Sequence, residues 1–220
     1  MSNAVIQLLV LAGIAIFLIL RLKSVLGTRE GFEKPSLPMP QGRTEGRKGK
    51  FEVIEGGPDR DITDHTPEGS DAAKALAAMK QAEPSFSVSE FLQGARGAYE
   101  MILMAFEKGD LASVRPFLSD LVYESFAEVV AAREAKGLTV TAEFVGIREL
   151  ALHDAEFDRD TGEGEVSVRF VGELISAARD KAGQVVEGNP KEVRRQRDVW
   201  TFARDMGSAD PNWRLVATGE

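Results

Sequence analysis

Few residues in this sequence are suited to acid–base, nucleophilic or metal chemistry. The chain has 220 residues, no cysteine and two histidines, which excludes a thiol nucleophile and argues against a structural zinc site. His153 and Asp154 are adjacent, so on a strand they point to opposite faces and form no acid–base dyad. His65 lies in a Gly/Pro-rich stretch, where we expect it to be solvated. We predict no catalytic residue, no cofactor and no metal site.

An acidic run at Asp158 and Asp160 begins like a calcium-binding loop. Gly162 stands where a further ligand is needed, however, and Arg169 replaces the closing glutamate. The pattern therefore predicts a hairpin turn over residues 158–164.

One dense basic cluster lies near the C-terminal end, at Lys191, Arg194, Arg195 and Arg197. On a strand, Arg195 and Arg197 share one face and Arg194 takes the other. Two interpretations stay open: a solvated hairpin with ion pairs, or a contact for an anion or an acidic partner.

Five aromatic side chains could line the concave face of a sheet. Core packing could account for all of them, or they could surround an apolar pocket. The five residues are Phe144, Phe170, Trp200, Phe202 and Trp213.

The scaffold for these residues is a set of helices followed by strands. Ser87 to Glu90 matches a capping box, and apolar residues then recur at helical spacing as far as Phe106. Asp110 is expected to cap a short second helix. A third helix over 119–136 is expected to turn five residues inward: Leu121, Val122, Phe126, Val129 and Val130.

From Leu138 the apolar period changes from 3.6 to 2, which predicts strands near 138–147, 165–174, 193–204 and 213–218, with a bulge at Gly146. Helices first and hairpin-linked strands after them predict an α+β fold over residues 85–220, with helices packed on an antiparallel sheet.

The N-terminal segment has the composition of a membrane anchor. Residues 4–20 are apolar except for Gln7, and we place a transmembrane anchor over 4–22. A cleaved signal and a buried helix are the alternatives, but basic residues follow the segment and none precedes it. The same asymmetry predicts that the N-terminus is outside and the remainder is cytoplasmic. Arg21, Lys23 and Arg29 are then expected at the membrane interface.

Residues 23–84 are expected to form a flexible Gly/Pro-rich neck. Residues 21–60 carry nine Lys or Arg against six acidic residues, whereas residues 61–220 carry 18 against 29. The basic residues of the neck could rest on anionic lipids. A short helix over 71–83 is expected to be an exposed, alanine-rich spacer, with a weak helix that binds to the membrane surface as the alternative. The net charge of −8 argues against nucleic-acid binding.

Two stretches of the sequence resemble a known domain. The spacing of Gly94-Ala95-Arg96, Tyr99-Glu100, Phe106 and Gly109-Asp110 is similar to that in Tim44-like domains, as is the end of the chain, Trp200-Thr201-Phe202 with Asp210-Pro211-Asn212-Trp213. The closest resemblance is to the bacterial TimA-type adaptor proteins of alphaproteobacteria. It implies a cystatin-like, nuclear-transport-factor-like fold with a curved sheet, and adaptor work at an inner membrane in place of catalysis.

We therefore expect a single-pass protein of the bacterial inner membrane that is not an enzyme and presents a partner-binding domain at the cytoplasmic face. The partner would be a protein, such as a translocon, a chaperone or a ribosome, in protein translocation, chaperone recruitment or membrane protein biogenesis. Anionic lipids would contact the neck.

The alternative is an apolar small-molecule or lipid-binding pocket. A third hypothesis is an enzyme like ketosteroid isomerase, with its base among Glu143, Glu165, Glu173 and Asp198.

Overall fold

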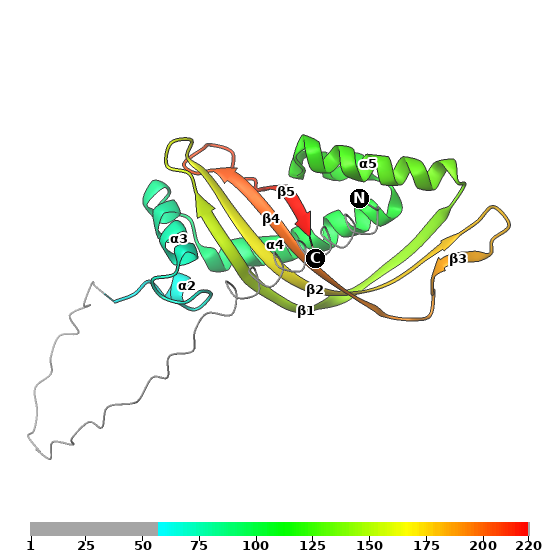
Figure 1. Cartoon of the computed structure of the whole chain (residues 1–220), viewed down its shortest axis with the longest axis horizontal. Coiled ribbons are helices and arrows are strands. Elements are labelled where there is room, and N and C mark those ends of the chain that lie inside the picture. Colours follow the sequence, from blue (N-terminus) through cyan, green and yellow to red (C-terminus); the bar gives the residue numbers. More distant parts are fainter. Residues whose placement is uncertain (1–56, 220) are drawn as a thin grey trace, which may run out of the picture. The chain divides into compact units, whose positions relative to one another are not determined.

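A curved antiparallel sheet and the helices packed against it make up the part of the chain that the computed structural model describes, residues 57–219 (Figure 1). The predicted anchor over 4–22, its interface residues Arg21, Lys23 and Arg29, and the neck as far as residue 56 lie outside the described residues. Between residues 57 and 219, no helix is both long and apolar enough to span a bilayer.

The sheet has the strand order β1-β2-β4-β5, and β3 pairs with β2 beyond the N-terminal end of β4. All strand pairs are antiparallel, so the predicted α+β fold with helices on a curved antiparallel sheet is confirmed. The strands are β1 (Thr139–Phe157), β2 (Glu163–Arg179), β3 (Val185–Gly188), β4 (Arg194–Asp205) and β5 (Arg214–Gly219).

The first strand is much longer than its sequence pattern predicts. β1 contains the expected irregularity at Gly146, and two further register shifts follow, between Ile147 and Glu149 and between Leu152 and Asp154. Each shift moves the following side chains to the opposite face of the sheet, so a simple alternation cannot be read along the whole strand. β3 was not predicted because all four of its residues are exposed and show no alternation.

The helix α4 (Val88–Lys108) packs against β1 and carries much of the core. The predicted cap is present, since the Ser87 side chain accepts a hydrogen bond from the Glu90 N–H at 3.3 Å. Gly109 ends the helix with a φ of 74°, a conformation that glycine adopts without strain. The tyrosine in the middle of its buried stripe, Tyr99, is completely enclosed.

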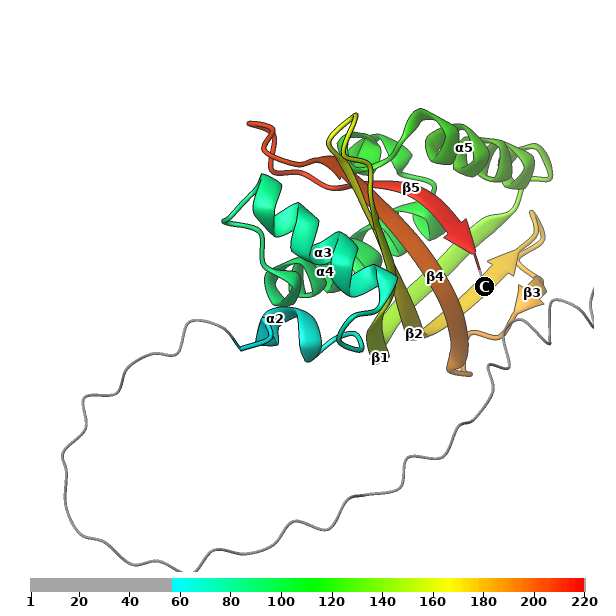
Figure 2. The ribbon, with the colours of Figure 1, turned by 60° about the vertical axis from the view of Figure 1, so that its left-hand side comes forward.

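The segment before α4 is folded, contrary to our expectation of an exposed spacer. It contains α2 (Arg60–Thr63) and α3 (Asp71–Ala82), and in Figure 2 α3 lies beside β1. Leu76 and Met79 are fully buried in the main core. The alanines of α3 let its backbone approach the sheet closely, so few large side chains suffice for burial. The folded part therefore begins before residue 85.

The short helix η1 (Leu111–Phe117) and α5 (Asp120–Ala135) follow α4. Two expectations here were wrong. The Asp110 side chain makes no capping hydrogen bond to η1. Of the five apolar residues expected to face inward on α5, Val122 is buried, but Leu121 is 70% exposed and Val129 is 42% exposed. α5 contacts η1 and β5, and it packs by the narrow stripe of Val122, Phe126 and Val130. Within this stripe, the Phe126 ring lies against Phe106 of α4, with ring centres 4.7 Å apart.

Candidate functional site

The concave face of the sheet is filled by Tyr99 and the aromatic residues around it. The Tyr99 ring stacks on Phe170 with ring centres 4.4 Å apart, and its distances to Trp200 and Phe144 are 4.7 and 6.3 Å. Phe170 and Trp200 are buried as part of this cluster. These members of the predicted aromatic pocket therefore contribute to the core. The side chain of Tyr99, from α4, fills the space in front of them.

The other two members of the predicted pocket, Phe202 and Trp213, border a groove beside the first half of α4. We call this hollow of about 440 Å³ the α4 groove. Gly94 and Gly97 form part of its floor, and a Cβ at either position would meet no atom within 4 Å. The remaining apolar walls include Phe86, Phe91, Ala98, Met101 and Phe117. The five aromatic residues thus do not line one cavity, since Phe144, Phe170 and Trp200 do not line this groove, and Phe202 is itself buried in the core.

The basic cluster lies where β4 begins, beside a larger and more polar hollow. This hollow of about 560 Å³, called the β4 hollow below, is lined by residues of β1, β2, β3 and β4 and by the C-terminal ends of α4 and α5. The register places Arg194 opposite Leu174, and Arg195 opposite Glu173. Arg194 is therefore on the core face and Arg195 on the other, as predicted. Arg194, Arg195 and Arg197 line the hollow together with Glu107, Arg133, Gln196 and Asp198. Lys191 is exposed in the preceding loop.

Two buried carboxylates accompany the basic cluster, and both are held by partners. Asp198 accepts hydrogen bonds from the Tyr99 hydroxyl at 2.5 Å and from the Gln196 side chain at 3.0 Å. Burial, and then the Asp198 carboxylate, raise the pKa of Tyr99 well above its usual value, so it remains a hydrogen-bond donor. Glu173 pairs with Arg148 and Arg195 at 2.9 and 3.0 Å, and these bonds lower its pKa.

The other two carboxylates considered as enzymatic bases lie elsewhere. Glu143 is exposed on β1. Burial and then the charges of Glu163 and Glu156 raise the pKa of Glu165. Glu165 does not belong to the residues that line the β4 hollow or the α4 groove. Of the four candidate bases, the one whose pKa is raised, Glu165, thus lies outside both of these hollows.

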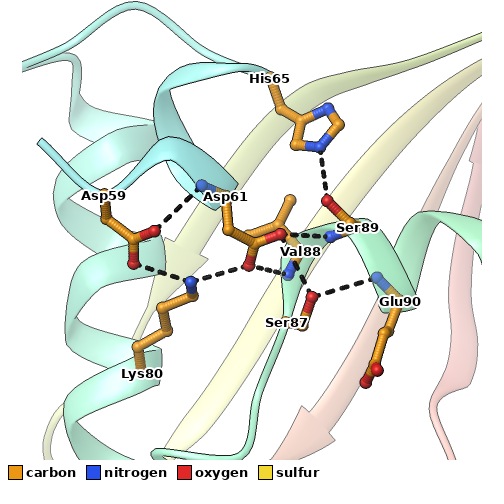
Figure 3. A network of polar contacts seen from close by, with 8 residues as sticks. All are labelled: Asp59, Asp61, His65, Lys80, Ser87, Val88, Ser89 and Glu90. Atoms are coloured by element: carbon orange, nitrogen blue, oxygen red, sulfur yellow. Dashed lines mark hydrogen bonds and ion pairs between the residues drawn. The ribbon is translucent and has the colours of Figure 1, made fainter.

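A polar network joins α2, α3 and the start of α4 (Figure 3). The Asp61 carboxylate accepts the backbone N–H groups of Val88 and Ser89 at 2.8 and 2.9 Å. Lys80 lies between Asp61 and Asp59, at 2.7 Å from each. Partial burial alone would raise the pKa of Asp61, but the bonds from Lys80, Ser89 and Val88 prevail and lower it.

The two histidines occupy unlike positions. His153 is exposed on β1, within the strand and not at its end. His65 is half-buried, and its Nε2 lies 3.1 Å from the Ser89 hydroxyl, so the expectation of a solvated residue was wrong. Within residues 57–219, no group of three or more His, Asp or Glu residues is arranged to hold a metal ion.

Sequence reasoning missed the Tyr99–Asp198 pair and the Asp61 network. In each case the partners are far apart in sequence, by 99 residues for Tyr99 and Asp198 and by 27 for Asp61 and Val88. The one available signal was the capping box at Ser87, which marks the start of α4. It does not indicate that the Asp61 carboxylate also binds the N–H groups at this end of the helix.

Comparison with known proteins gives one family match and a set of distant relatives. The model of the Tim44-like domain matches residues 72–220. The human mitochondrial import inner membrane translocase subunit TIM44 is 25% identical over 151 residues, which cover 67% of this chain and 33% of that protein. The rat protein of the same name is 24% identical over the same shares. The chain thus spans about a third of the length of these curated relatives.

Among solved structures, the intermembrane space region of the chloroplast protein ARC6 matches with a TM-score of 0.39 and 13% identity. The match covers 58% of this chain and 94% of that one. The likeness is too weak to bear on fold or function.

Proposed function

Because this chain belongs to the Tim44-like domain family, we propose that it is a membrane-anchored adaptor that presents this domain to a protein partner. The family match over residues 72–220 carries the proposal. The curated relatives are named as subunits of a mitochondrial import translocase of the inner membrane. From them we transfer a role in protein translocation or membrane protein biogenesis, with a translocon, chaperone or ribosome as the partner.

The proposed location is a bacterial inner membrane, with residues 4–22 as the anchor and the domain in the cytoplasm. The apolar run of residues 4–20 supports this, as do Arg21, Lys23 and Arg29 on its C-terminal side. These three residues contact anionic lipids in the proposed arrangement. The acidic body gains nothing from an anionic membrane, so the anchor is what keeps it there. We also propose that the chain is a bacterial TimA-type protein.

The domain is proposed to act by binding and not by catalysis. A general base needs a free carboxylate within reach of a substrate. Asp198 and Glu173 are both occupied by hydrogen-bond donors, and Glu165 is outside the two hollows. The α4 groove and the basic cluster on β4 are surface features to which a partner could bind.

Deletion of residues 1–26 tests the anchor. We expect the full chain in the membrane fraction and the deleted chain in the soluble fraction. The deleted chain should also lose the partners that the full chain labels in cells. Fractionation and proximity labelling from a fused biotin ligase measure the two effects.

A deletion of equal length, residues 30–55, is the matched control because it keeps residues 4–22. It should remain in the membrane fraction. A chain without residues 1–26 that still sediments with membranes would contradict the proposal. So would a full chain whose labelled neighbours do not differ from those of a fluorescent protein fused to residues 1–26.

The α4 groove favours a second function, the binding of an apolar small molecule or lipid. Its volume of about 440 Å³ and its aromatic walls suit such a ligand. Native mass spectrometry of residues 57–220 should then show an added mass, and Gly97→Leu should remove it by filling the groove. If both samples show the mass of the protein alone, the ligand-binding function is wrong and the adaptor function remains.

A further inference from the structure

The strand β4 has a neighbour on both sides along only part of its length. It pairs with β2 from Arg194 to Asp205, whereas β5 pairs with it only from Val199 to Ala203. Figure 1 shows β4 continuing past the end of β5. Among the described residues, the stretch Arg194–Asp198 therefore has a strand on one side only. The other side presents backbone N–H and C=O groups that can pair with an added strand.

The β4 hollow borders the stretch of β4 that has this open edge. All five residues from Arg194 to Asp198 line it, and its far wall includes Arg133 of α5 and Glu107 of α4. Five residues of extended chain are about 17 Å long, so a strand of this length is enough to cover the edge.

The charges along the edge select the kind of strand that fits. Within residues 57–219, Arg195 is paired with Glu173, but Arg194 and Arg197 take part in no ion pair. Two carboxylates that line the hollow already accept hydrogen bonds, and a third, Glu187, lies on β3, which pairs with β2 and not with β4. Asp198 accepts from Tyr99 and Gln196, and Glu107 accepts from the Ser176 hydroxyl at 2.7 Å. On the face of the sheet that carries Arg195 and Arg197, the single carboxylate of Glu173 is shared by Arg148 and Arg195. That face therefore carries an excess of positive charge, on a body with 29 acidic and 18 basic residues from residue 61 onward.

We propose that the β4 edge from Arg194 to Asp198 is the docking site for an extended acidic segment of the partner protein, which adds to the sheet as a strand in the row begun by β5. This inference rests on the proposed function, because it names the class of partner that the adaptor binds. Acidic side chains at alternate positions of the segment lie on one face of the sheet. They meet Arg197 beside Arg195 in one register, and Arg194 on the other face when the register shifts by one residue, so a change of both Arg194 and Arg197 removes the unpaired arginine of either face. A second copy of the same edge is a poorer occupant, because antiparallel pairing centred on Gln196 would set Arg195 against Arg197.

A labelled eight-residue peptide of alternating Glu and Val, added to the full chain in mild detergent, tests the proposal by fluorescence anisotropy. We expect saturable binding that weakens as salt is raised. The double variant R194E/R197E should weaken it by about tenfold. R159E, in the exposed turn between β1 and β2, should leave it unchanged. Both variants should keep the melting temperature of the wild type, since none of the three arginines is buried.

Hydrogen exchange distinguishes an added strand from simple charge attraction. The peptide should slow amide exchange within residues 194–198, and a version N-methylated at alternate amides should not bind. Equal binding of the N-methylated peptide, or of a Lys/Val peptide, would overturn the proposal. If no peptide binds and R194E/R197E causes self-association, the arginines only protect an edge, and the proposal also fails.

The docking site and the adaptor function can fail separately. If R194E/R197E abolishes peptide binding but the full chain with this change labels the same partners in cells as the wild type, the adaptor stands and the β4 edge is not its docking site. If the peptide binds with protection of residues 194–198 while the full chain labels no specific partner, the strand-docking site stands and the proposed function falls.

Discussion

Replacing Gly172 by alanine should destabilise the domain by about 3 kcal/mol, even though it adds a single methyl group. Gly172 lies on β2 directly under Tyr99. A Cβ at this position would lie 2.6 Å from the Tyr99 hydroxyl oxygen and 3.0 Å from its Cε1. Tyr99 cannot move away, because its ring is stacked on Phe170 and its hydroxyl is bonded to Asp198. Urea denaturation of the wild type and the variant measures the difference.

The explanation predicts that the effect depends on the Tyr99 hydroxyl. Y99F alone should cost about 1–3 kcal/mol, because it leaves the buried Asp198 carboxylate with Gln196 as its remaining partner. In the Y99F background, however, G172A should cost at least about 1 kcal/mol less than in the wild type. Additive effects would show that the tyrosine is not what Gly172 accommodates.

A glycine of α4 supplies the matched control. Gly94 is helical, and a Cβ there would meet nothing within 4 Å. G94A should therefore raise the stability by about 0.5–1 kcal/mol, through higher helix propensity. The same substitution is thus expected to act in opposite directions at two glycines of one domain.

Those parts of the fold that depend on neighbouring residues could be predicted from the sequence. The limits of α4 follow from Ser87 and Gly109, which act within a turn of the helix ends. The turn at Asp158 is equally local, since its side chain accepts the Asp160 N–H at 2.8 Å. The full length of β1 was not predictable, because its register shifts depend on how it pairs with β2.

Burial and sites depend on contacts between distant segments, and there the sequence is a weaker guide. The exposure of Leu121 reflects how α5 is placed on β5, and no pattern within α5 contains that information. Likewise, Asp198 was one of four candidate bases, and only the fold shows that its carboxylate accepts a hydrogen bond from the Tyr99 hydroxyl. The basic cluster was visible as a cluster, but its position on a half-paired strand follows from where β5 ends.

The second large effect is expected at Asp61, which connects α2 to the start of α4. D61A should destabilise the domain by about 2–3 kcal/mol at pH 7. It removes a charged acceptor from two backbone N–H groups and from Lys80. α2 and α3 should also exchange amide hydrogens faster, because the network in Figure 3 links them to α4. D71N, at an exposed acid paired with Lys74 in the first turn of α3, is the control and should change little.

The pH dependence identifies the cause of this loss. The pKa of Asp61 is lowered in the folded state from its ordinary value of 3.8. Its contribution is therefore complete above that value and is lost as the pH falls toward the folded-state pKa. The stability difference between wild type and D61A should be constant from pH 7 to 5, and should shrink by about 1 kcal/mol by pH 3. Lys80 does not alter this trend because its pKa is raised and it stays charged throughout. A difference that stays the same down to pH 3 would mean that the Asp61 carboxylate packs against α4 without its charge stabilising the fold.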